Sequence, residues 1–310
     1  MESLNRMSIE LVDEALDFAE ELDIGAYELD NGATVLDFGV DFDGGIEAGL
    51  LLTEIQTAGL ATVQSRIDSV AGVTLPHIEL STDHPALALL CSQKAGWEIS
   101  VDGYEALGSG PARALVAQET EFQELDYVDI FDLTVLALES DTLPSDSVAE
   151  HVANLADVDT SGVFLPTFPT ASVAGGVSLA ARAPELALFR LFELGYDPSD
   201  VITASGTAPL PPIPADEDIA IARANDALAY GGKAHLVVRE DFDQFSEVPS
   251  SATNEYGRPF EQILEEADWD FYAIDDDVFA PADITIDVVG GPTYSFGEPN
   301  ESILQESFEL

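Results

Sequence analysis

Arg182 and Glu185, three residues apart, are the side chains in this sequence best suited to acid–base chemistry. They stand between a run of small apolar residues, 171–181, and an amphipathic segment that ends at Gly195. Such a pair can be an exposed ion pair at a helix start, which contributes little free energy. It can also line a pocket, because glycine and alanine let a flat ligand approach closely. A surface helix in so acidic a chain should carry more acidic residues than this segment does. The interpretation as a pocket-lining pair is therefore favoured over an exposed ion pair.

The sequence GSGPAR, 108–113, is a second candidate site. Backbone N–H groups in such a glycine loop can bind an anion, and Arg113 could add a bidentate donor. A tight turn carrying a surface arginine is the alternative. The motif departs from a dinucleotide fingerprint, since Arg113 replaces the third glycine and Pro111 lies inside it. A nicotinamide cofactor is therefore a weak interpretation.

Arg223 and Asp226 lie within a predicted helix and fall on one face as an i,i+3 pair. Taken alone, this is an ordinary helix pair. Asp226 could instead hold a heterocycle through hydrogen bonds to its carboxylate.

Metal ligands are not grouped in this sequence. Its four histidines, at positions 77, 84, 151 and 235, show no ligand spacing, and Cys91 in an apolar run is expected to be core. The run 275–277, three aspartates, lacks the glycine and terminal glutamate of a calcium loop. We expect no metal. No GxSxG motif occurs, which argues against a serine hydrolase.

Charge is the dominant property of the chain as a whole. Its 310 residues include 60 acids and 10 bases, a formal net charge of −50, while 46% are hydrophobic, as in a globular protein. The acids are spread along the whole length, which favours a surface adapted to multimolar salt over one that binds a basic partner. Without a basic stripe, nucleic-acid binding is not expected. The few cations, Lys94 among them, should serve specific anions or partners.

The N-terminus, 1–22, is an acidic amphipathic helix rather than a signal peptide, and no run of about 18 apolar residues occurs. We therefore expect a soluble, cytoplasmic protein without a membrane partner.

Periodicity and turn signals predict a mixed α/β fold. A helix at 8–22 should be capped by Ser8, Asn31-Gly32 should close a hairpin, and 103–115 should form a loop. From about 130 to 240, predicted strands and helices alternate as in parallel βαβ units: strands 132–138, 162–166, 200–204 and 233–239, with helices 145–156, 184–194 and 216–229. We expect two α/β domains with a pocket between them. Residues 1–100 plus 241–310 would form one domain, and 101–240 the other.

Several sequence blocks together resemble the methenyltetrahydromethanopterin cyclohydrolase family. They are TDHPALALLCSQKAGW (82–97), GSGPARAL (108–115), PTASVAGGVSLAARAPE (169–185), ASGTAPLPPIP (204–214), RANDALAYGG (223–232) and DDDVFAPA (275–282). The resemblance covers essentially the whole chain, and the acidic composition is similar to that of a version from a salt-loving archaeon.

This resemblance implies interconversion of 5,10-methenyltetrahydromethanopterin and its N5-formyl form, using water and no metal or redox cofactor. It implies two α/β domains and a homotrimer. The positions matching the catalytic pair are Arg182 and Glu185, and Pro184 between them is a departure from the family pattern. Either a helix starts at Pro184, or a longer helix is kinked there. Lys94, Ser109 and Arg113 are implied pocket residues, with Asp226 as a further candidate.

Other functions stay open at this point. The same reaction could use tetrahydrofolate, whose tail lacks phosphate. The chain could also be a non-catalytic pterin- or phosphate-binding protein with a structural Arg182–Glu185 pair. A dinucleotide enzyme that uses the glycine loop is a third possibility.

Overall fold

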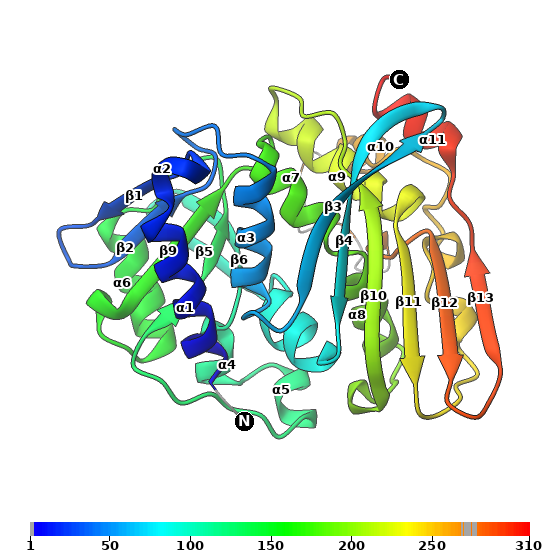
Figure 1. Cartoon of the computed structure of the whole chain (residues 1–310), viewed down its shortest axis with the longest axis horizontal. Helices are drawn as coiled ribbons and strands as arrows, with labels where there is room; N and C mark the ends of the chain where they lie inside the picture. Colours follow the sequence, from blue (N-terminus) through cyan, green and yellow to red (C-terminus); the bar gives the residue numbers. More distant parts are fainter. Residues whose placement is uncertain (1–2, 268, 270–273, 275–277) are drawn as a thin grey trace. The chain divides into compact units, whose positions relative to one another are not determined.

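The computed structural model describes residues 3–267, 269, 274 and 278–310, so the aspartate run 275–277 lies outside the described residues. The chain divides into two compact units (Figure 1). Unit 1 comprises Met1–Thr62 and Leu87–Ser178, and unit 2 comprises Val63–Ala86 and Leu179–Leu310. Each unit combines helices with one mixed sheet, which confirms the α/β class.

Unit 1 is built on a sheet with strand order β1-β2-β9-β8-β6-β5, and β7 also pairs with β9. Its strands are β1 (Gly25–Glu28), β2 (Thr34–Asp37), β5 (Trp97–Val101), β6 (Tyr104–Ser109), β7 (Thr134–Val135), β8 (Ala137–Glu139) and β9 (Val163–Phe168). Its helices are α1 (Leu4–Asp17), α2 (Ala19–Leu22), α3 (Ile46–Gln56), the π-helix η1 (Ala86–Gln93), α4 (Ala112–Val116), α5 (Thr120–Glu124), α6 (Asp146–Ala156), the short 3₁₀ turn η2 (Thr160–Gly162) and α7 (Val173–Ala180).

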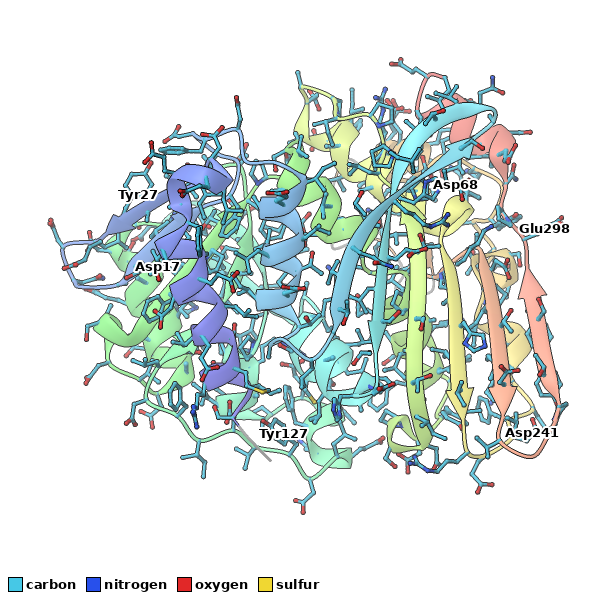
Figure 2. The ribbon with its side chains drawn as sticks, in the orientation of Figure 1. Asp17, Tyr27, Asp68, Tyr127, Asp241 and Glu298 are labelled. Carbon is cyan, nitrogen blue, oxygen red and sulfur yellow. The ribbon has the colours of Figure 1, made fainter. Side chains whose placement is uncertain are left out.

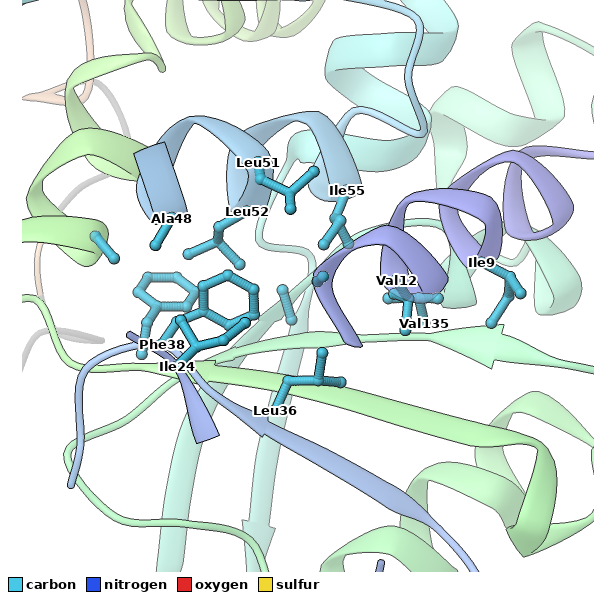
Figure 3. Close-up of a cluster of buried hydrophobic side chains, with 14 residues drawn as sticks. Ile9, Val12, Ile24, Leu36, Phe38, Ala48, Leu51, Leu52, Ile55 and Val135 are labelled. Carbon is cyan, nitrogen blue, oxygen red and sulfur yellow. The ribbon is translucent and has the colours of Figure 1, made fainter. Parts of the chain in front are cut away.

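Both faces of the unit 1 sheet are covered, because successive strand side chains point to opposite sides. Leu36 of β2 packs with Val12 of α1 and Leu52 of α3, as Figure 3 shows. Its neighbour Val35 lies in a separate buried cluster with residues of α6 such as Val152. Helices α1 and α3 therefore cover one face and α6 the other.

Unit 2 is built on a sheet with strand order β13-β12-β11-β10-β4-β3. Its strands are β3 (Thr62–Val70), β4 (Val73–Thr82), β10 (Val201–Pro209), β11 (Lys233–Val238), β12 (Asp283–Val288) and β13 (Thr293–Gly297). Its helices are α8 (Ala183–Glu193), α9 (Glu217–Gly231), α10 (Phe260–Glu266), α11 (Glu301–Ser307) and the 3₁₀ turns η3 (Pro198–Asp200), η4 (Phe245–Glu247) and η5 (Ser250–Ala252). Helix α8 packs on β10 and β11, and α9 contacts β10, α10 and α11.

The expectation of parallel βαβ units from 130 to 240 is only partly correct. Strands β8 and β9, joined through α6, are parallel as predicted. Strands β10 and β11, joined through α9, are antiparallel, and β11 instead forms its parallel pair with β12. The predicted alternation of strands and helices is observed, but alternation does not specify which strands form hydrogen bonds to each other.

The expected domain boundaries also differ from the observed division. Strands β10 and β11 share a sheet with β12 and β13, which the predicted boundaries assign to the other domain. Likewise, β2 pairs with β9 across more than one hundred residues of chain. These boundaries depend on non-local strand pairing, which composition and local pattern do not reveal.

Two local predictions were wrong. Residues 103–115 are not a loop, since they contain strand β6 and helix α4. The first helix is capped by Ser3, whose side chain accepts from the N–H of Arg6. Ser8 is buried within that helix, where its hydroxyl donates to the Ile55 carbonyl at 2.9 Å. Among the described residues, no helix has the length and apolarity needed to cross a membrane.

Candidate active site

The start of α8 positions Arg182 and Glu185. Arg182 is the N-cap, Ala183 the first helical residue and Pro184 the second, and the N–H of Leu186 donates to the Arg182 carbonyl at 2.9 Å. The first residues of a helix have no intrahelical partner for their N–H groups, so a proline there costs no hydrogen bond. Of the two alternatives for Pro184, a helix start is therefore correct.

Glu185 and Arg182 form a partly buried ion pair. Arg182 Nε donates to Glu185 Oε2 at 2.8 Å, with 1% of the glutamate side chain and 15% of the arginine side chain exposed. This is not the exposed pair that the spacing alone would favour. A buried carboxylate needs such a partner, because an isolated charge away from water is very costly.

Strand β10 packs closely against the start of α8. A Cβ atom at Gly206 would lie 2.6 Å from Pro184 Cδ and 2.8 Å from the Lys233 carbonyl oxygen. Only glycine allows the first turn of α8 to approach the strand so closely. This close contact fixes the position of the Arg182 and Glu185 backbone relative to the sheet of unit 2.

Arg113 lies in unit 1 at the centre of a charged cluster, with none of its side chain exposed. Its five N–H groups donate to both carboxylate oxygens of Glu119, to Glu121 and to the carbonyls of Leu90 and Lys94. Among the described residues these acceptors account for every donor of the guanidinium. Arg113 is thus not a surface arginine, and in this arrangement it has no N–H left to offer an anion.

Lys94 belongs to the same cluster. Its Nζ lies 2.7 Å from Glu121 Oε1 and 3.9 Å from Glu119 Oε2, with 22% of its side chain exposed. Burial raises the pKa of Glu119, although Arg113 opposes this. Burial also disfavours ionisation of Glu121, but Lys94 and Arg113 outweigh it and hold the pKa of Glu121 below its usual range. Two cations and two carboxylates thus share one partly buried site.

Ser109 takes part in a buried polar network at the end of β6. Its Oγ accepts from Gln56 Nε2 at 3.0 Å, and the Ser178 hydroxyl donates to Gln56 Oε1 at 2.7 Å. The network joins α3, β6 and α7 within unit 1. Ser109 is therefore positioned on a rigid element, although it is not on the glycine loop that we expected.

Arg223 and Asp226 do not form the i,i+3 pair that the sequence suggested. Arg223 lies 2.8 Å from Glu309 Oε2, whereas Asp226 Oδ1 accepts from the Phe260 N–H at 2.8 Å. Burial raises the pKa of Asp226 to about 7. Asp226 thus links α9 to the start of α10, and its carboxyl group is unusually ready to hold a proton.

A family model described as Cyclohydrolase (MCH) matches residues 3–308. The chain belongs to this family. A methenyltetrahydromethanopterin cyclohydrolase from Halobacterium salinarum is 61% identical over 310 residues, covering all of both chains. Proteins of the same name from Methanocella arvoryzae and Methanococcus maripaludis are 42% and 41% identical, with at least 98% of each chain covered. The resemblance found in the sequence is confirmed, and the chain is a hydrolase of the cyclohydrolase type.

The sequence did not indicate three polar residues that contact the predicted site residues. Gln56 contacts Ser109, and Glu119 and Glu121 contact Lys94 and Arg113. The scarcity of cations signalled that Lys94 and Arg113 need anionic partners. It could not indicate which of 60 acids would supply them. The described residues also contain no group of three His, Cys, Asp or Glu side chains able to hold a metal ion. The absence of a cofactor stays a prediction.

Proposed function

We propose that this chain interconverts 5,10-methenyltetrahydromethanopterin plus water and N5-formyltetrahydromethanopterin. Family membership and full-length relatives of that name support the reaction. The observation that carries the mechanism is the buried Glu185 carboxylate, held by Arg182 on the first turn of α8. A base at this place is pre-oriented and shielded from bulk water, which favours proton transfer to a bound group.

The substrate determines what the site must supply. Its methenyl carbon is part of an amidinium cation and is already electrophilic. Glu185 takes a proton from the attacking water as the new C–O bond forms. It then delivers that proton to N10 as the C–N10 bond of the carbinolamine breaks, and the carboxylate takes the carbinolamine O–H proton as the formyl C=O forms on N5. This second proton is released to solvent, so the reaction yields one proton overall. General acid–base transfer of this kind typically contributes about 10²–10⁴-fold.

Arg182 orients the carboxylate of Glu185, the proposed base, through the 2.8 Å hydrogen bond. Lys94 and Ser109 are proposed substrate contacts, Lys94 because its cationic side chain is partly exposed. Arg113 contributes indirectly, by holding Glu119 and Glu121 beside Lys94. Asp226 is proposed as a contact to the substrate heterocycle. A homotrimer, a cytoplasmic location and the absence of a cofactor remain expectations from the resemblance.

The test is Glu185→Gln, which keeps the size of the side chain and removes the base. The near-ultraviolet band of the methenyl compound should decay with wild-type protein in multimolar KCl. With the variant, kcat should fall at least about 10²-fold. A variant that stays folded and bleaches the band at nearly the wild-type rate would remove Glu185 from the mechanism.

The same assay distinguishes the two carriers and a non-catalytic binding protein. A separate binding measurement with a nicotinamide cofactor tests the dinucleotide enzyme. Bleaching of methenyltetrahydrofolate instead of the methanopterin compound would keep the reaction and change the substrate. Binding of either compound without bleaching would favour a non-catalytic pterin-binding protein. Tight binding of a nicotinamide cofactor would favour the dinucleotide enzyme.

A further inference from the structure

The side-chain amide of Gln56 joins two elements of unit 1 that lead to proposed site residues. Gln56 is the last residue of α3 and is 3% exposed. Its Oε1 accepts from the Ser178 hydroxyl of α7 at 2.7 Å, and its Nε2 donates to Ser109 Oγ at the end of β6 at 3.0 Å. Because breaking a buried hydrogen bond leaves polar groups unpaired, such a bridge fixes the elements that it joins.

The backbone at the end of α3 is held as well. The Ser92 hydroxyl donates to the Gln56 carbonyl, and the Thr57 hydroxyl donates to the Thr53 carbonyl at 3.0 Å. All of these residues are buried. The Gln56 amide therefore extends from a backbone that is itself fixed, as a residue that orients others requires.

Helices α3 and α7 also approach each other closely. A Cβ atom at Gly49 would lie 2.6 Å from Val177 Cβ and 2.9 Å from the Ala174 carbonyl oxygen. Gly49 and Gln56 are seven residues apart and so lie on the same face of α3. This face contacts α7 near its start at Ala174 and near its end at Ser178. Helix α3 therefore supports α7 along its length.

The chain from α7 to the proposed catalytic pair is short. Ser178 is the last residue of unit 1, and α7 ends at Ala180. The N–H of Arg182 donates to the Leu179 carbonyl at 3.0 Å, so a tight turn joins α7 to the start of α8. Arg182 thus follows Ser178 by about one helical turn. No long loop lies between them that could absorb a displacement of α7.

We propose that Gln56 is a positioning residue for the reaction, a deepening that rests on the proposed function. Its amide holds Ser178 and so fixes the point from which the chain runs to Arg182 and Glu185. Gln56 itself takes no part in proton transfer or bond making. Without the amide, the end of α7 shifts and displaces the general base, and small displacements of catalytic groups lower the rate strongly.

Ser178→Ala is the first test, because it removes a single hydroxyl and should leave the fold intact. The value of kcat should fall about tenfold to a hundredfold, while KM changes less than about threefold. Gln56→Met keeps the length of the side chain, removes both polar atoms and should lower kcat by a similar factor. The double variant should be no slower than Gln56→Met, because both changes remove the same contact.

Gln56→Glu is the conservative variant that should restore activity. Burial favours its neutral acid at pH 6, which accepts from Ser178 and donates to Ser109 as the amide does. At this pH its kcat should stay within about threefold of the wild-type value. The matched control is Thr57→Val, which removes a buried hydroxyl that donates to the Thr53 and Glu54 carbonyls. This control should not lower kcat.

The variants decide the assignment together, with circular dichroism in multimolar KCl to show that each is folded. Lowered kcat in Ser178→Ala and Gln56→Met, with retained kcat in Gln56→Glu and Thr57→Val, supports it. Unchanged kcat in folded Ser178→Ala, or an equal fall in Thr57→Val, overturns it while leaving the proposed function intact. Wild-type protein that converts neither carrier overturns the proposed function and this assignment with it.

Discussion

At the residue scale, the scarcity of cations does not by itself distinguish candidate site residues from cations in structural ion pairs. Most arginines form ion pairs with carboxylates of the same unit; Arg66, Arg223 and Arg258, for example, pair with Glu79, Glu309 and Glu255. What distinguishes Arg182 is the burial of its partner Glu185. Arg113 is still more deeply buried, but its donors are all taken by the protein, which indicates a structural role. The burial of its carboxylate partner distinguishes Arg182 from the arginines in exposed ion pairs. The use of all its N–H groups by protein acceptors distinguishes Arg113.

Asp226 gives a prediction about pH and stability. Burial raises its pKa from an ordinary value near 3.8 to about 7, helped by Glu261 and Glu306 and opposed by hydrogen bonds from Ser307 and Phe260. The folded state therefore holds the proton more tightly than the unfolded state. The stability associated with this proton is fully present below about pH 4 and is lost as the pH rises through 7.

Asp226→Asn should therefore stabilise the protein at pH 8, because asparagine still accepts from the Phe260 N–H and carries no charge. The gain should reach up to about 4 kcal/mol, from a pKa raised by about three at about 1.4 kcal/mol each. Denaturant unfolding in high salt at pH 8 and pH 5.5 should show the gain shrinking at the lower pH. A variant less stable than wild type at pH 8 would contradict the prediction. A rise in KM would support Asp226 as a substrate contact.

At the element scale, the position of the proposed catalytic pair, Arg182 and Glu185, depends on the close approach of α8 to β10. Gly206→Ala would place a methyl group against Pro184 and the Lys233 carbonyl, so the first turn of α8 must shift. We expect a loss of about 1–3 kcal/mol in unfolding free energy and at least a tenfold fall in kcat, since small displacements of catalytic groups are costly.

Gly45→Ala is a suitable control for this variant. Gly45 precedes α3 in unit 1, and a Cβ atom there would meet nothing within 4 Å. Its activity should stay close to wild type. If Gly206→Ala were as active and as stable as Gly45→Ala, the approach of α8 to β10 would not position the pair.

At the scale of the whole molecule, the charge of −50 is the property with the largest consequence. Acidic side chains such as Asp17 in unit 1 and Asp68 and Glu298 in unit 2 are exposed and project from the ribbon (Figure 2). Repulsion among them is screened only when the Debye length is short, about 3 Å at 1 M salt. Folding of this chain should therefore depend on salt.

We expect the melting temperature to fall by on the order of 10 °C or more between 2 M and 0.1 M KCl, because several kcal/mol of repulsion are no longer screened. A thermal scan by circular dichroism measures this directly. Sucrose at equal osmolality in 0.1 M KCl is the control, and it should not restore the loss if screening is the cause. Full stability in dilute buffer would argue against adaptation to salt.

The sequence by itself determined the α/β class, the family and most of the local elements. The predicted helix 184–194 is observed as Ala183–Glu193, and the strand predicted at 162–166 is observed as Val163–Phe168. These features follow from periodicity, turn residues and proline, which act over a few neighbouring residues. The three-residue spacing of Arg182 and Glu185 likewise indicated a possible ion pair.

Only the tertiary structure decided which strands pair, where the two units divide and which polar groups are satisfied. The antiparallel pairing of β10 with β11 and the ion pairs of Lys94 and Arg113 with Glu121 involve contacts that residue spacing alone does not signal. Such contacts are selected by the free energy of packing and hydrogen bonding of a whole unit. Residue type and spacing cannot supply that information.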